Sequence, residues 1–161
     1  MPENLNIRYL TSKWLLFIFF ILVCSFHLKV RATHLIIPMD EVQKNHLKSY
    51  GIAFYALEKK LEVDWLLNYR GGSFALKLND NILKECKVRG VSFEIVADVQ
   101  YNNIVSQITR PEINQDVMKL EKAPKIAVYS PKNKQPWDDA VTLVMSYAEI
   151  PYEIIYDEEI I

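Results

Sequence analysis

Short apolar runs alternate with longer segments of helical periodicity along residues 34–156, and this alternation constrains the fold more than any other feature. The runs have the length of buried strands. The segments between them carry apolar residues at three- and four-residue steps, the period of an amphipathic helix. Strands that alternate with helices are typical of a largely parallel sheet covered on both faces. The sequence therefore predicts a three-layer α/β fold with a mostly parallel sheet.

The expected elements follow from these runs and from their flanking residues. Asp40 precedes the first helical segment, residues 41–61, with Gln43 at a capping-box spacing, and Gly90 closes the helix expected over residues 80–89. Two more helices are expected over 102–108 and 137–149, and residues 109–124 form a polar connection. The strands are expected to begin near Leu35, Val63, Val91, Ile126 and Tyr152. The predicted core comprises Ile36, Phe54, Leu57, Leu66, Ile95, Val128, Leu143 and Ile154.

A second strand–helix–strand unit begins at Lys125, so the expected domains are residues 33–118 and an incomplete unit over 119–161. The helix over 137–149 is expected to bury Val141, Leu143, Val144, Tyr147 and Ala148. The chain ends just after the last expected strand, before the helix that would follow it. We therefore expect the chain to be truncated.

The first 32 residues have the pattern of a signal peptide. A segment with Arg8 and Lys13 precedes the apolar run 14–26, which is shorter than the roughly 20 residues that span a bilayer. Residues 30–32, Val-Arg-Ala, place small side chains where a signal peptidase acts, so cleavage is expected before Thr33. The sequence predicts export to the periplasm or cell envelope. An uncleaved N-terminal anchor is the alternative, and lipidation of Cys24 is not expected.

Composition and net charge exclude some classes of protein. Half of the residues are hydrophobic, which excludes an intrinsically disordered chain. The net charge of −1 divides into +3 over residues 1–32 and −4 over residues 33–161. No basic surface for nucleic acid is indicated, and contact with a membrane is expected only through the signal segment. Cys86 is the single cysteine of residues 33–161; it shares a helical stripe with Ile82 and Leu83 and is expected to be a buried hydrophobe rather than a nucleophile.

The turn Tyr69-Arg70-Gly71-Gly72-Ser73 is the main candidate for binding, at the carboxyl end of a strand where open α/β sheets hold ligands. The glycines let backbone amides converge on an anion, and the Arg70 guanidinium and Ser73 hydroxyl can donate to it. A small carboxylate or phosphate ligand is expected, and the alternative is a plain Gly-Gly turn with a solvated arginine. No metal or other cofactor is expected. Further candidates at strand ends are Asp40, Asn68, Asp98, Ser130, Lys132 and Lys134.

Several stretches resemble the N-terminal part of an exported bacterial family whose members are labelled asparagine synthetase B. The resemblance covers essentially all of residues 33–161 and is carried by residues 34–40 (HLIIPMD), 43–48 (QKNHLK), 63–74 (VDWLLNYRGGSF), 121–134 (EKAPKIAVYSPKNK) and 136–144 (PWDDAVTLV). Members of this family are more than twice as long. Their later region is similar to the flavodoxin-like, class I glutamine amidotransferase-like fold, so the unit from Lys125 would be its beginning.

The resemblance implies amide or amidotransferase chemistry, but its motifs are not complete here. Such a synthetase uses an N-terminal Cys, whereas residue 2 is Pro and the expected mature N-terminus is Thr33. Gly71-Gly72-Ser73 lacks the Asp and second Ser of a pyrophosphate loop, and Cys86 does not lie on a nucleophile elbow. The leading hypothesis is therefore the N-terminal part of such an exported protein, catalytically incomplete within 161 residues. The alternative is a non-catalytic module of the cell envelope that binds a ligand or a protein.

Overall fold

The computed structural model describes residues 32–113, 116–129 and 140–156. The chain divides into two compact units, Met1–Val30 and Arg31–Ile161, and all described residues belong to the second. The expected signal segment therefore lies outside the described residues. Among those residues, no helix combines the length and the apolarity that crossing a membrane requires.

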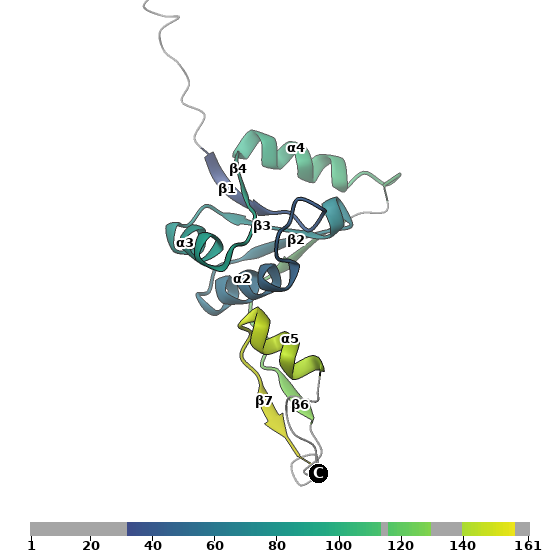
Figure 1. The fold of residues 1–161 in the computed structure, drawn as a ribbon. Helices are drawn as coiled ribbons and strands as arrows, with labels where there is room; N and C mark the ends of the chain where they lie inside the picture. Colours follow the sequence, from purple (N-terminus) through teal and green to yellow (C-terminus); the bar gives the residue numbers. More distant parts are fainter. Residues whose placement is uncertain (1–31, 114–115, 130–139, 157–161) are drawn as a thin grey trace, which may run out of the picture. The chain divides into compact units, whose positions relative to one another are not determined.

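A five-stranded sheet forms the centre of the second unit (Figure 1), and every neighbouring pair of its strands is antiparallel. The spatial order is β4-β1-β3-β2-β5. The prediction of a mostly parallel sheet is therefore wrong for this part of the chain. The strands are β1 (Ala32–Ile37), β2 (Val63–Leu67), β3 (Ser73–Lys77), β4 (Glu94–Ala97) and β5 (Asp116–Leu120).

The connections explain why the sheet is antiparallel. The first four strands and two helices follow the order β1-α2-β2-β3-α3-β4, with the strands arranged 4-1-3-2, which is the split βαβ or ferredoxin-like topology. A tight turn leads from β2 into β3, so these strands form a hairpin, and no α-helix separates them. Strands β3 and β5 are not among the predicted strands, because residue 73 is predicted to end a turn and residues 109–124 to form a polar connection. The helices of this part of the chain are α2 (His46–Glu58), α3 (Asp80–Arg89) and α4 (Asp98–Ile108).

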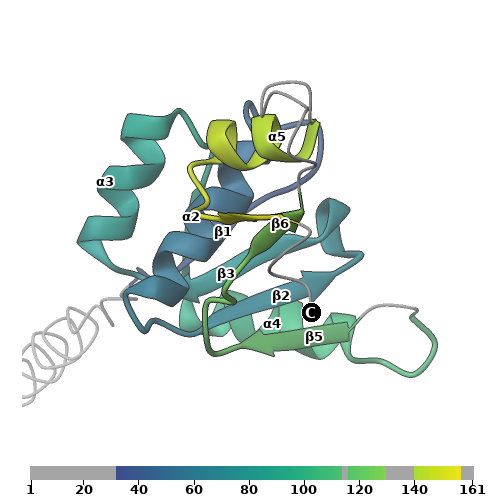
Figure 2. The ribbon, with the colours of Figure 1, turned by 90° about the horizontal axis from the view of Figure 1, so that it is seen from below.

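Helices cover both faces of the sheet, as expected. In Figure 1, α2 and α3 lie on one side of the strands and α4 lies on the other. Side chains of β1 alternate between the two cores, because successive residues of a strand point to opposite faces. Leu35 and Ile37 pack with the α2 and α3 core, whereas Ile36 packs with Tyr101 and Ile108 of α4. In Figure 2, β5 runs beside β2 at the edge of the sheet.

The helix ends follow local capping. Gly90 closes α3 in a left-handed conformation, with φ of 70°, and the predicted bounds of this helix are confirmed. The expected start of α2 is wrong. Its N-cap is Asn45, whose side chain accepts the N–H of Lys48 at 3.1 Å. Asp40 instead accepts the N–H of Val42 within the preceding turn. The α4 helix begins at Asp98, four residues before its expected start.

A parallel pair of strands begins the second strand–helix–strand unit. Residue Val128 of β6 (Ala127–Tyr129) pairs with Ile154 of β7 (Glu153–Ile155), and α5 (Ala140–Ala148) connects the two strands in sequence. The prediction of this unit from Lys125 is confirmed for these elements. The expected helical residues 137–139 lie outside the described residues.

Most predicted core residues are buried, and the exceptions lie on the edge strand β4 and on helix α5. Five of the predicted residues are buried in the core, namely Ile36, Phe54, Leu57, Leu66 and Val128. Ile154 is half-buried. Ile95 is 43% exposed because it lies on the edge strand β4, and Leu143 is 64% exposed. On α5 the expected burial of Ala148 is confirmed, but that of the other four residues is wrong, since Val141, Leu143, Val144 and Tyr147 are exposed. The helix buries Thr142 as well.

Candidate functional site

The turn between β2 and β3 lies against the end of β1. It contains the short helix η1 (Tyr69–Gly71). Arg70, Gly71 and Gly72 all have positive φ, at 47°, 81° and 92°. The Met39 N–H donates to the Arg70 carbonyl at 3.1 Å, and a Cβ on Gly71 would come within 2.3 Å of the Met39 carbonyl oxygen. This close approach, together with the left-handed backbone, explains why glycine stands at position 71.

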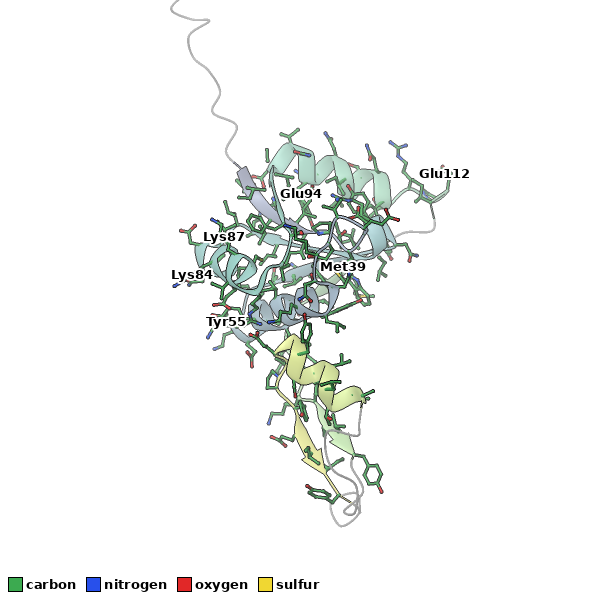
Figure 3. The ribbon with its side chains drawn as sticks, viewed as in Figure 1. Met39, Tyr55, Lys84, Lys87, Glu94 and Glu112 are labelled. Carbon is green, nitrogen blue, oxygen red and sulfur yellow. The ribbon has the colours of Figure 1, made fainter. Side chains whose placement is uncertain are left out.

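The guanidinium of Arg70 binds two carboxylates of its own chain. Its Nε donates to Oδ2 of Asp40 at 2.6 Å, and its Nη1 donates to Oε1 of Glu94 at 2.8 Å. These hydrogen bonds raise the pKa of Arg70, and the bond from Arg70 lowers the pKa of Asp40. The three side chains carry a net charge of −1. We call Asp40, Arg70 and Glu94 the carboxylate–arginine cluster; Figure 3 labels Glu94 and the neighbouring Met39.

The Ser73 hydroxyl and the Gly72 N–H, two other predicted donors of the turn, have partners within it. Ser73 is buried, and its hydroxyl donates to the carbonyl of Tyr69 at 3.0 Å. The indole N–H of Trp65 donates to the carbonyl of Gly72 at 3.1 Å, and Tyr69 packs against the core beneath α4. The arrangement accounts for Tyr69, Arg70, Gly71, Gly72 and Ser73 as parts of a self-supporting turn. Binding of an anion by these residues stays a prediction.

The predicted strand-end groups do not all meet. The turn brings Asp40 to Arg70, but Asp98 follows β4, which runs antiparallel to β1 and ends at the opposite edge of the sheet. Asp98 therefore does not lie beside Asp40 and Arg70. Asn68 precedes η1 as its N-cap residue, and Ser130, Lys132 and Lys134 lie outside the described residues.

A second polar cluster, which the sequence analysis missed, connects β1 to α4. The Nδ1 of buried His34 lies 3.0 Å from Oδ1 of Asp98, and its ring stacks on Tyr101 with centroids 4.0 Å apart. The Tyr101 hydroxyl donates to Asp64 at 2.5 Å. Burial lowers the pKa of His34. In the sequence, the position of Asp98 after a strand marks it as a candidate polar group. Nothing in the sequence indicates that it contacts His34.

The geometry of this second cluster suits a structural role rather than nucleophilic catalysis. The Thr33 hydroxyl donates to Asp98 and lies 3.2 Å from Nδ1 of His34. Both the hydroxyl and the carboxylate therefore meet the same ring nitrogen. In a catalytic relay the nucleophile and the carboxylate meet opposite nitrogens of the imidazole. The cluster joins the start of α4 to the start of β1.

The Cys86 thiol is fully buried in the core beneath α2 and α3, and burial raises its pKa to about 12. A thiol that stays protonated at neutral pH is a poor nucleophile. The prediction of a buried hydrophobic cysteine is confirmed. Within residues 32–113, 116–129 and 140–156, no three His, Cys, Asp or Glu side chains come together in a way that could hold a metal ion.

An open hollow with a volume of about 270 Å³ lies between α2 and the β2–β5 side of the sheet. We call it the apolar groove. Its lining includes Tyr50, Phe54, Trp65, Phe74 and Ile150, and no lining side chain carries a charge. The sequence analysis did not identify it, because these residues are far apart in sequence and resemble ordinary core residues.

The fold and these sites define a mixed α/β protein with a ferredoxin-like sheet, a parallel strand pair and an apolar groove. Comparisons with protein-family models, with curated proteins and with solved structures found no match.

Proposed function

We propose that this chain is the N-terminal part of an exported protein of the family labelled asparagine synthetase B, with glutamine amidotransferase-like architecture. We further propose that residues 33–156 bind a ligand in the cell envelope and do not convert it. The sequence resemblance supports the family. The parallel pair of β6 and β7 is consistent with the first strands of a flavodoxin-like unit.

The apolar groove is the observation that favours binding. Ligand sites in proteins are concave and mostly apolar, with few polar groups. Three polar groups with possible chemistry are instead used inside the fold: Arg70 pairs with two carboxylates, His34 pairs with Asp98, and Cys86 is a buried thiol. These engagements support a role for this part of the chain in recognition.

Export is tested by sequencing the N-terminus of the protein recovered from the envelope fraction of its cells. The basic segment, the short apolar run and residues 30–32 lead us to expect a start at Thr33 or within a few residues of it. Recovery of intact Met1 from a soluble cytosolic fraction would contradict the proposal.

Binding without conversion is tested with the envelope-purified protein and a small-molecule extract of the same cells. After washing, the protein is denatured, and the released molecule is identified by mass spectrometry. We expect one compound, identical to a component of the extract. The variant Ile150→Glu, which places a carboxylate in the apolar groove, should release none, and the matched variant Leu143→Glu, at an exposed position of α5, should release it as the wild type does. Release of a chemically altered compound would favour an enzyme.

A further inference from the structure

Aromatic rings form the main wall of the apolar groove. The ring of Phe74 meets Tyr50 edge to face with centroids 5.4 Å apart, and it stacks on Trp65 at 6.2 Å. Phe54 of α2 also lines the groove. Aromatic rings prefer edge-to-face and offset-stacked partners, and such pairs add free energy beyond the burial of their area. The wall therefore offers ring faces and ring edges to a further aromatic group.

The polar atoms of the lining indicate what charge a ligand in the groove can carry. Of the described lining residues, only Tyr50 and Trp65 have polar side-chain atoms, and the Trp65 indole N–H is already donated to the Gly72 carbonyl. The surface that the groove offers is almost entirely apolar. A charged group placed in this groove would lose its water and gain no counter-charge, which is costly. The chemistry of the lining favours a neutral molecule.

The mouth of the groove is held in place by the end of α5. Ile150 lines the groove, and the preceding Glu149 binds Lys48 of α2 at 3.0 Å and Arg89 of α3 at 3.2 Å. Ala148 is buried with its carbonyl against Gly51 of α2. The residue at the mouth is therefore positioned before a ligand arrives, and preorganisation lowers the cost of binding.

We propose that the apolar groove is a binding site for a small, neutral aromatic molecule. Its volume of about 270 Å³ accommodates a fused two-ring compound. The inference rests on the proposed binding function and names the ligand class of that site. The lining is an open concave surface that combines side chains of α2, β2, β3, the end of β5 and the residue after α5.

The test is a titration of the envelope-purified protein with 2-naphthol, followed through the Trp65 indole N–H resonance in a ¹H–¹⁵N spectrum. The resonance is assigned from its loss in the variant Trp65→Phe. Because this N–H belongs to a residue that lines the groove, its shift reports binding in the groove. We expect a saturable shift with one molecule per chain. The anion 2-naphthoate has the same rings, and it should bind at least ten-fold more weakly.

Two matched variants place the site. Ile150→Glu puts a carboxylate at the mouth and should weaken 2-naphthol binding at least ten-fold. Leu143→Glu makes the same kind of change at an exposed position of α5 outside the groove, and it should leave binding unchanged. Equal loss in both variants would overturn the placement. Melting curves of both variants show whether each is folded.

The remaining outcomes separate this inference from the proposed function. Tighter binding of 2-naphthoate at Trp65 would overturn the neutral class and leave a binding function in place. No shift with either compound would overturn the site, and the extract experiment would then judge the binding function independently. A concentration-dependent dimer that Ile150→Glu dissociates, with no effect of 2-naphthol, would mean that a second copy covers the groove.

Discussion

Arg70 illustrates how one residue can determine the shape of a strand end. Its backbone is left-handed, its carbonyl accepts the Met39 N–H, and its guanidinium reaches Asp40 after β1 and Glu94 at the start of β4. A side chain that joins three segments this way stabilises the sheet edge. From sequence alone the same arginine is predicted to be a ligand group. A Gly-Gly turn with a cation has the same sequence pattern whether the cation binds a ligand or a carboxylate of the chain.

Replacing Arg70 tests these two roles. We expect Arg70→Ala to lower the free energy of unfolding by about 1–2 kcal/mol, since it leaves two partly buried carboxylates without their donor. Urea unfolding measures this change, and Arg110→Ala, at an exposed arginine, should be close to neutral. Unchanged stability together with weaker binding of inorganic phosphate or acetate would favour the anion site.

Protonation of His34 is expected to make the stability of the protein depend on pH in mildly acidic solution. Burial lowers its pKa below 6.5 in the folded state, so the unfolded chain takes up the proton first as the pH falls. The contribution to stability is complete above about pH 6.5 and is lost as the pH falls towards the folded-state pKa. The lowered pKa of Asp98 acts in the same direction at lower pH.

We therefore expect the free energy of unfolding to fall between pH 7 and pH 5, and to fall less steeply in His34→Gln. Urea unfolding at several pH values measures both slopes. The wild type and the variant would show parallel curves if His34 did not titrate on unfolding.

At the scale of elements, the contact between α2 and α5 depends on a glycine. A Cβ at position 51 would come within 1.8 Å of the carbonyl oxygen of Ala148, so the helices approach closely only because Gly51 lacks a side chain. Gly51 therefore permits the close packing of one helix on another.

Gly51→Ala should separate α5 from α2 and cost about 1–3 kcal/mol, the usual range for overpacking. Hydrogen exchange is the decisive measurement, because α5 amides should lose protection first. The matched change Gly90→Ala strains a left-handed residue in open space, so it should lower overall stability without a selective effect on α5. Equal protection of α5 in both variants would contradict this account.

Local signals predicted some elements well. The bounds of α3 followed from its periodicity and from Gly90, and the β6–α5–β7 unit followed from its apolar runs. The strand β3 was missed because Ser73 was assigned to the turn that precedes it. The strand β5 was missed because its half-exposed pattern, with Met118 and Lys119 exposed, resembles a polar connection.

At the scale of the whole described unit, strand direction could not be predicted from hydrophobicity. The residues of β1 and β3 read as continuous apolar runs because helices cover both faces of the sheet. Such runs are typical of parallel sheets, but an antiparallel sheet between two helical layers produces the same pattern. The hairpin turn at Arg70–Gly72 determines the direction. The apolar groove likewise depends on long-range contacts that no local pattern specifies.

The position of β1 has a consequence for how the protein is made. This strand lies inside the sheet between β3 and β4, yet it is synthesised before the other described strands. Its hydrogen-bonding partners run to Ala97, so the sheet cannot close until most of this unit has left the ribosome. Such long-range pairing slows folding. In the proposed export pathway, slow closure of the sheet would give the chain more time to reach a translocation channel before it folds.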